Sequence, residues 1–146
     1  MKPAIRMLLA AYVCALACFL LMDSCWLSLT GQRLYQPAIG ALMSPQVDWR
    51  AVALFYPLYL VGLMVFAIVP GLAVGRPAMA LGRGALLGLV SYAAYDLTNQ
   101  ATLRGWPWSL TLVDMVWGVV VSATSAWVGT WLGLWADGSL TSRPRN

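Results

Sequence analysis

Long apolar stretches, broken by short polar segments, run along most of the chain. A helix needs about 20 apolar residues to cross the hydrocarbon core of a bilayer, and several of these stretches reach that length. They predict four spanning helices, at residues 3–30, 49–70, 78–99 and 109–135. We therefore expect an all-α fold, an integral membrane four-helix bundle that forms one transmembrane domain over residues 1–146, with a polar tail at 136–146.

The first apolar stretch could be a signal peptide or a membrane span. Lys2 and Arg6 ahead of an apolar run are typical of a signal peptide, but this run is longer than the roughly 7–15 apolar residues of such a peptide. We therefore interpret residues 3–30 as a retained span. Residues 31–48 are expected to connect the first two spans, with the apolar residues 39–43 able to lie flat at the membrane interface.

The composition agrees with a membrane location. Hydrophobic residues make up 61% of the chain and charged residues 10%, whereas an ordinary soluble domain has about 45–50% and about 25%. The net charge of +4 comes from basic residues scattered singly along the chain, so it does not indicate a nucleic-acid partner.

The distribution of basic residues predicts an orientation. Four spans place both ends of the chain on one side of the membrane, and cytoplasmic segments of membrane proteins are enriched in Lys and Arg. The side of the termini carries Lys2, Arg6, Arg76, Arg83, Arg143 and Arg145, and the opposite side carries Arg33, Arg50 and Arg104. This bias predicts cytoplasmic termini.

The histidine and cysteine content limits the catalytic and metal-binding chemistry that this chain can support. The chain has no histidine, which is the commonest general base and the commonest metal ligand. The three cysteines, Cys14, Cys18 and Cys25, all fall in the first span, so they do not indicate a disulfide framework. We expect no metal and no cofactor.

Three aspartates stand out in this apolar context: Asp23, Asp96 and Asp114. A carboxylate in the middle of a bilayer costs about 2.5 kcal/mol or more, so such residues usually face a bundle interior or a wet cavity. Asp23 and Asp96 come late in outward-going spans, and Asp114 comes early in an inward-going one. All three should therefore lie at a similar depth in the outer half of the bilayer, in a shared recess.

Helical spacing identifies which faces point inward, because residues on one face recur every three to four positions. One arc of the third span combines polar and small residues, namely Tyr92, Tyr95, Asp96, Asn99, Gly84 and Gly88. A corresponding stripe on the fourth span contains Asp114, Gly118, Ser122, Ser125 and Gly129. Small residues at such spacing allow close helix packing, which accounts for most of these positions without any further function.

Tryptophans are expected at the membrane surface. Trp117, Trp127, Trp131 and Trp135 share an arc of the fourth span that should face lipid or headgroups. Trp26, Trp49, Trp106 and Trp108 cluster near the outer boundary and should form an interfacial belt.

Asp96 needs compensation, because it lies near a helix C-terminus, where the helix dipole disfavours an anion. Tyr92 and Asn99, one turn away on either side, can donate hydrogen bonds to it. Arg104 is a charge partner close in sequence, and Arg33 is a further basic residue on the same side. The alternative to a functional role is a structural ion pair that fixes the loop after the third span.

The other two aspartates also have structural interpretations. Asp23 could be a hydrogen-bonded tie to Tyr56 or Tyr59 of the second span, which occur at similar depth. Thr111 and Asp114 have the spacing of a capping box, which would start the fourth span and place the acid where the helix dipole favours it.

One segment of the chain resembles a known signature. Residues 92–103 (YAAYDLTNQATL), followed by Trp106 and Pro107, resemble the signature of a bacterial family of predicted inner-membrane proteins of unknown function. Residues 23–27, 55–59 and 111–118 are similar to further parts of that family, so the resemblance covers nearly the whole chain. It implies a small four-helix protein of the bacterial inner (plasma) membrane and supplies no activity, substrate or cofactor.

Three functions remain open from the sequence. A polar pocket could bind or modify a lipid or a small apolar molecule, with a carboxylate as proton donor or acceptor. A non-catalytic scaffold could use the small-residue stripes to contact a membrane partner or a second copy of the chain. A proton or cation carrier could use the acids as its path. The candidate pocket residues are Asp23, Tyr92, Tyr95, Asp96, Asn99 and Asp114.

Overall fold

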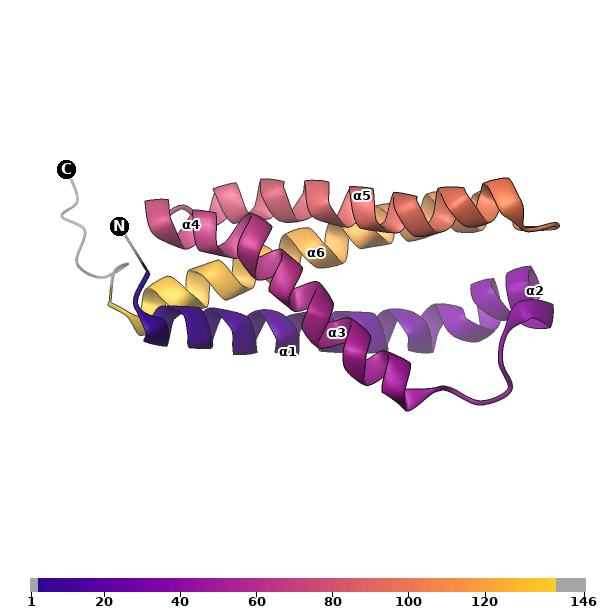
Figure 1. The fold of residues 1–146 in the computed structure, drawn as a ribbon, viewed down its shortest axis with the longest axis horizontal. Helices are drawn as coiled ribbons and strands as arrows, with labels where there is room; N and C mark the ends of the chain where they lie inside the picture. The colour runs from indigo at the N-terminus through magenta and orange to yellow at the C-terminus, as the bar shows by residue number, and fades with distance from the viewer. Residues whose placement is uncertain (1–2, 139–146) are drawn as a thin grey trace.

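The computed structural model describes residues 3–138, and this part of the chain is helical without a strand. The long helices that make up the molecule are α1 (Ile5–Thr30), α3 (Trp49–Leu63) continued by α4 (Val69–Val74), α5 (Pro77–Thr102) and α6 (Trp108–Ala136). Helices α1, α5 and α6 run along its long axis, and α3 crosses them obliquely (Figure 1). The prediction of an all-α chain is confirmed for the described residues. The predicted polar tail lies outside them from residue 139 onward.

The first helix extends well beyond its predicted end. A π-helical turn, Gly31–Tyr35, follows α1 directly and leads into α2 (Gln36–Ile39) and a 3₁₀ turn, Gly40–Leu42. The first span was predicted to end at residue 30, whereas helical turns continue to Leu42 within the segment that connects it to α3. Pro37 does not interrupt the helix, because it lies in the first turn of α2, where its missing N–H is tolerated.

Three stretches of the described chain are long and apolar enough to cross a membrane: Ile5–Leu42, Trp49–Val74 and Trp108–Ala136. A π-helical turn, Met64–Ile68, joins α3 to α4 within the second of them. The 26-residue α5 is long enough to span but is not among the three. Its C-terminal half carries polar residues such as Asp96 and Asn99, which lower its mean hydropathy.

Small residues let α5 approach α6 closely, as their spacing predicts. Gly84 and Gly88 are buried, and a Cβ placed on Gly88 would lie 2.1 Å from the carbonyl oxygen of Gly118. On another side of α6, a Cβ on Gly129 would lie 2.8 Å from the carbonyl oxygen of Ala11 in α1. The small stripe of α6 therefore serves two neighbouring helices.

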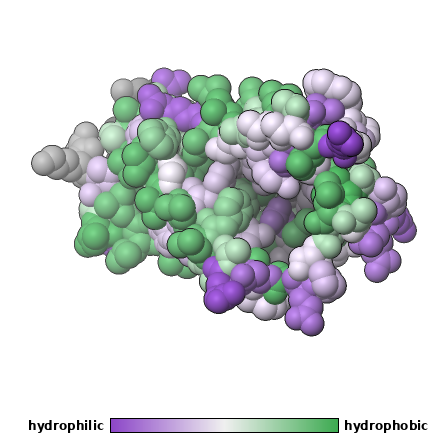
Figure 2. All heavy atoms as spheres, turned by 45° about the vertical axis from the view of Figure 1, so that its right-hand side comes forward, coloured by the Kyte–Doolittle hydropathy of each residue, from purple (hydrophilic) through white to green (hydrophobic). Residues whose placement is uncertain are grey.

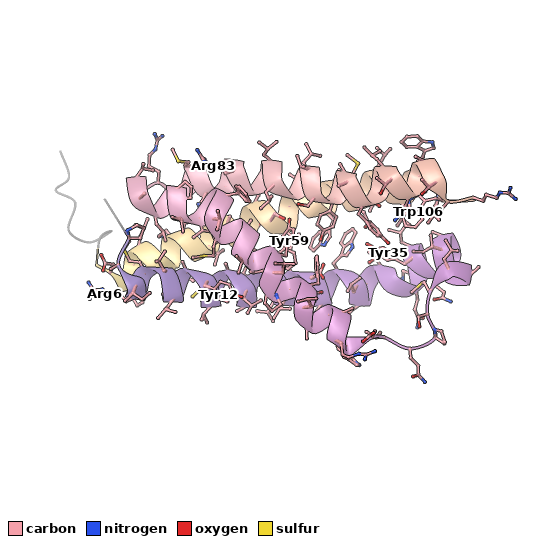
Figure 3. The ribbon with its side chains drawn as sticks, in the orientation of Figure 1. Arg6, Tyr12, Tyr35, Tyr59, Arg83 and Trp106 are labelled. Atoms are coloured by element: carbon pink, nitrogen blue, oxygen red, sulfur yellow. The ribbon has the colours of Figure 1, made fainter. Side chains whose placement is uncertain are left out.

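Apolar side chains fill the half of the bundle nearer the chain ends. The cluster consists of Met7, Ala11, Ala15, Phe19, Leu60, Leu63, Ala67, Ile68, Leu72, Ala80, Val121, Ala126 and Leu134. An ion pair between Arg6 and Asp137 (2.5 Å) ties the beginning of α1 to the end of α6. Figure 3 shows Arg6 at this end, far from the opposite end where Tyr35 lies.

Helix α3 begins with a titratable cap. Asp48, fully exposed, accepts hydrogen bonds from the backbone N–H of Arg50 (3.0 Å) and from its guanidinium. The hydrogen bond from the Arg50 side chain, followed by that from its backbone, lowers the pKa of Asp48 below its ordinary value. The cap therefore stabilises the helix start above the ordinary pKa of aspartate, and this contribution is lost as the pH falls through the lowered pKa.

We expect amide protection at Arg50 and Ala51 to decrease as the pH drops below the ordinary aspartate range of about 4. Hydrogen exchange, corrected for the intrinsic pH dependence of the exchange rate, measures this directly. The Asp48→Asn variant keeps a capping oxygen but does not titrate, so its protection should not change with pH. Equal pH dependence in both proteins would contradict this assignment.

Candidate functional site

The three aspartates lie in the half of the bundle away from the chain ends. Asp23 comes from α1, Asp96 from α5 and Asp114 from α6, and they are 9%, 0% and 6% exposed. Asp114 interacts electrostatically with both of the others. No three acidic or sulfur-bearing side chains in the described residues are placed to hold a metal ion. The structure thus brings the acids into one region without joining them into a metal-ligand set.

Asp23 has a complete set of neutral donors. The Tyr56 hydroxyl, from α3, donates to one carboxylate oxygen (2.5 Å), and the Trp117 indole N–H, from α6, donates to the other (3.1 Å). One side chain therefore connects three helices. Trp117 was expected to face lipid, and this prediction is wrong because its N–H bonds to Asp23 and its ring packs against the core. Trp127, Trp131 and Trp135 are exposed, as predicted.

Asp114 is held by a second chain of donors. The Tyr35 hydroxyl donates to its carboxylate, and the Trp26 indole N–H donates to that same hydroxyl (3.0 Å). Tyr35 is the last residue of the π-helical turn that follows α1. The rings of Trp26 and Trp117 stack with centroids 4.5 Å apart and planes 6° from parallel, so the two networks meet at one aromatic pair.

Asp96 differs from the other two acids. Its side chain is fully buried, and neither carboxylate oxygen has a hydrogen-bond partner. The expectation that Tyr92 or Asn99 donates to it is wrong, and Asn99 interacts with Tyr95 instead. An ionised carboxylate buried without donors is strongly destabilising, because it loses its hydration and gains nothing in return.

The basic residues do not compensate the acids. Arg33 and Arg104 are both exposed, and within residues 3–138 neither forms an ion pair with any of the three aspartates. The proposed structural ion pair between Asp96 and Arg104 is therefore absent from the described chain. Among residues 3–138, no positive side chain forms an ion pair with Asp23, Asp96 or Asp114.

The capping-box interpretation of Thr111 and Asp114 is also wrong. Helix α6 begins at Trp108, a turn earlier, and its N-terminus has no side-chain cap. The Thr111 hydroxyl accepts a hydrogen bond from the Trp106 indole (3.0 Å) and donates to the Gln100 amide oxygen (3.1 Å). Trp106 was expected in an interfacial belt but is 6% exposed, because this network fixes it against the start of α6.

A groove of about 380 Å³ lies between α3 and α5. Its lining residues are Phe55, Tyr59, Ser91, Tyr92 and Tyr95. Tyr35 and Tyr59 lie between α5 and the α1–α3 side of the bundle (Figure 3). Tyr92 interacts electrostatically with Asp23 and Asp114, and Tyr95 with Asp96. The groove and the acidic region therefore share two tyrosines as a common wall.

Figure 2 views the end of the molecule away from the termini. It shows a hollow in the surface, rimmed by apolar and weakly polar side chains, with a hydrophilic side chain inside. Such a surface suits a molecule with an apolar body and a polar group, because each part would meet a matching environment.

Comparison with known proteins gives the family. Residues 8–131 match the family described as Predicted membrane protein (DUF2177). The chain belongs to this family. The matched part of this DUF2177 member runs from α1 into α6 and includes all three aspartates. No curated protein and no solved structure matches the chain.

Sequence reasoning missed several side chains of this candidate site in the DUF2177 protein, above all Tyr35, Trp26 and Trp117. A signal for the two tryptophans was available: each lies three residues after an aspartate, at the spacing that places Asp23 with Trp26, and Asp114 with Trp117, on one helix face. The structure uses these pairs crosswise, since each indole serves the carboxylate network of the opposite helix. No sequence signal pointed to Tyr35, because the π-helical turn that positions it was not anticipated.

We expect Tyr56→Phe to destabilise this DUF2177 protein by about 1.5 kcal/mol or more, because a hydrogen bond to a buried charged group is lost. The matched control is Tyr12→Phe, whose hydroxyl makes only a 3.5 Å contact to the Pro57 carbonyl oxygen. Unfolding by denaturant in detergent micelles measures both. Equal losses of stability would show that the Asp23 network adds nothing beyond ordinary packing.

Proposed function

We propose that this chain is a four-helix inner-membrane protein that binds an amphipathic molecule. The ligand is a lipid or a small apolar compound with a polar group, and its site is formed by the three aspartates and the tyrosines of the groove. The observation that carries the proposal is the buried, unpartnered carboxylate of Asp96, which follows directly on Tyr95 in α5, a residue that lines an apolar groove. The polar group would meet the acids, and the apolar body would lie along Tyr59, Tyr92 and Tyr95.

Chain geometry supports four crossings. Helix α4 ends near the chain ends, and α6 begins at the opposite end of the molecule (Figure 1). If the three apolar stretches cross the bilayer, the connecting helix α5 must cross it as well. Its polar residues are tolerable there because the most costly of them, Asp96, is turned inward and shielded from lipid.

Orientation is the second part of the proposal. Both ends of the described chain lie together, joined by the Arg6–Asp137 pair, as an even number of crossings requires. The excess of basic residues on this side comes from Lys2, Arg143 and Arg145, which are outside the described residues. With cytoplasmic termini, the acidic site lies in the outer half of the bilayer.

A proton or cation carrier is less well supported. A conducting path needs polar groups or water through the full thickness of the membrane. Large apolar side chains such as Phe19, Leu63 and Ile68 are fully buried in the core between the acids and the chain ends. A pure scaffold is also less well supported, because the Asp96 carboxylate makes no hydrogen bond that would hold one described helix to another.

Native mass spectrometry of the protein released from lipid nanodiscs tests the proposal. The unaltered protein should retain an amphiphile that Asp96→Leu loses, since leucine removes both acceptor oxygens. The control Asp48→Asn, at the exposed cap of α3, should retain it. The same bound species in all three proteins, or none in any, would contradict a site at Asp96.

A further inference from the structure

We propose that the polar group recognised at this site is a protonated amine, and that Asp96 is its counter-ion. The inference rests on the proposed function and adds the chemical class of the ligand. It follows from three features of the described residues: which acids have hydrogen-bond donors, which acid lacks them, and which groups surround that acid.

The donors are unevenly distributed. Asp23 receives two hydrogen bonds and Asp114 receives one, all from neutral tyrosine and tryptophan groups. Asp96 receives none and is fully buried. Within the described residues, the protein therefore supplies donors to two acids and leaves the buried carboxylate of the third without one.

The unpartnered carboxylate of Asp96 calls for a group with both positive charge and hydrogen-bond donors. Three carboxylates share this region, and no basic side chain of the described residues forms an ion pair with any of them. A proton on Asp96 would remove its charge but leave the group without a hydrogen-bond partner. A neutral hydroxyl would satisfy one oxygen of Asp96 and would supply no positive charge. An ammonium group supplies positive charge and up to three N–H donors at once.

In the described chain no three His, Cys, Asp or Glu side chains come together to hold a metal ion, so the placement of the acids does not favour a bare metal ion. An ammonium group has no such requirement for several close carboxylates. It also gains from aromatic faces, which attract cations by about 0.5–2 kcal/mol. Tyr92 and Tyr95 precede Asp96 by four residues and one residue, and both line the groove that would take the apolar body of the ligand.

The amine could be part of a lipid headgroup or of a soluble molecule, and both sources share the same recognition chemistry. Three probes separate the possibilities: dodecylamine, dodecanol with the same apolar chain, and water-soluble butylamine. Isothermal titration calorimetry of the full chain in maltoside micelles gives the dissociation constants. Asp96→Asn is the decisive variant, because it keeps the size and an acceptor oxygen but removes the charge. Asp48→Asn is the matched control on an exposed aspartate.

The unaltered protein and Asp48→Asn should bind dodecylamine at least tenfold more tightly than dodecanol. Asp96→Asn should bind the two probes within about threefold of each other. Competition by butylamine would assign the site to soluble amines, and lack of competition would assign it to amines anchored in the bilayer; either result supports an amine site.

Two results would overturn the amine assignment while leaving amphiphile binding intact. One is equal affinity of the unaltered protein for dodecylamine and dodecanol. The other is a preference for dodecylamine that persists in Asp96→Asn. If neither probe binds saturably to the unaltered protein, the proposed function itself is refuted, so the two failures are distinguishable.

Discussion

Replacing Asp96 by leucine should stabilise the unliganded protein, by about 1–3 kcal/mol. The carboxylate is fully buried and has no hydrogen-bond partner, so its removal sacrifices no interaction within the described residues. Leucine is close in size to aspartate. Burying the carboxylate costs the free energy of its hydration, whereas burying the apolar leucine side chain carries no such cost. The expected sign is unusual, because most substitutions of buried residues destabilise a protein.

Asp23→Leu is the matched control and should behave in the opposite way. It leaves the Tyr56 hydroxyl and the Trp117 indole without their acceptor, which should cost about 3 kcal/mol or more. Denaturant unfolding in micelles, with added ligand excluded, compares the two. A loss of stability in Asp96→Leu as large as that in Asp23→Leu would mean that Asp96 is a structural tie, and the binding proposal would lose its main support.

The difference between these two variants bears on function. Proteins keep locally destabilising groups where activity needs them, and such groups are the usual sites of stabilising but inactivating substitutions. We therefore expect Asp96→Leu to be more stable and unable to retain a bound amphiphile. Replacing a residue that only helps the bundle to pack would not be expected to raise stability and abolish binding at the same time.

Gly88→Ala should give the largest loss of stability among single methyl additions to α5, about 3 kcal/mol. The new Cβ would lie 2.1 Å from the backbone oxygen of Gly118, a distance that no side-chain rotation can relieve. Helices α5 and α6 would have to separate, which would also disturb Tyr92, whose ring lies against Gly118. Because Tyr92 lines the groove between α3 and α5, binding of a ligand in this groove should weaken together with the stability.

Gly82→Ala tests whether this effect comes from packing. It lies on the same helix, and a Cβ there meets no atom within 4 Å. Since alanine favours a helix over glycine by about 1 kcal/mol, this variant should be neutral or slightly more stable. Thermal unfolding of both variants in the same detergent gives the comparison. Similar stability of the two would refute the close contact between α5 and α6.

Much of the fold could be predicted from the pattern of apolar residues. The first and fourth spans were predicted at residues 3–30 and 109–135, and the helices are Ile5–Thr30 and Trp108–Ala136. The pattern does not encode the π-helical turn after α1, because such a turn depends on a local change of hydrogen bonding rather than on hydropathy. Hydropathy therefore predicted the helix for residues 3–30 but not its continuation to Leu42.

For the site, the topology was informative, and among the hydrogen-bond partners the predicted tie between Asp23 and Tyr56 is confirmed, whereas Trp117 and Tyr35 were not anticipated. The direction of each span was enough to place the three aspartates toward one end of the bundle. Their donors come from other helices: Tyr56 from α3, Trp117 from α6 and Tyr35 from the turn after α1. Spacing within one helix indicated Tyr92 and Asn99 as donors to Asp96, and it failed because contacts between helices decide which groups are satisfied.

An experimental structure of the full chain in a lipid nanodisc tests the central claim most directly. We predict that Asp23 and Asp114 keep their tyrosine and tryptophan donors, and that density for a bound molecule begins at the Asp96 carboxylate and continues along the groove between α3 and α5. A side chain of Arg33 or Arg104 paired with Asp96, with the groove closed by its own walls, would contradict it.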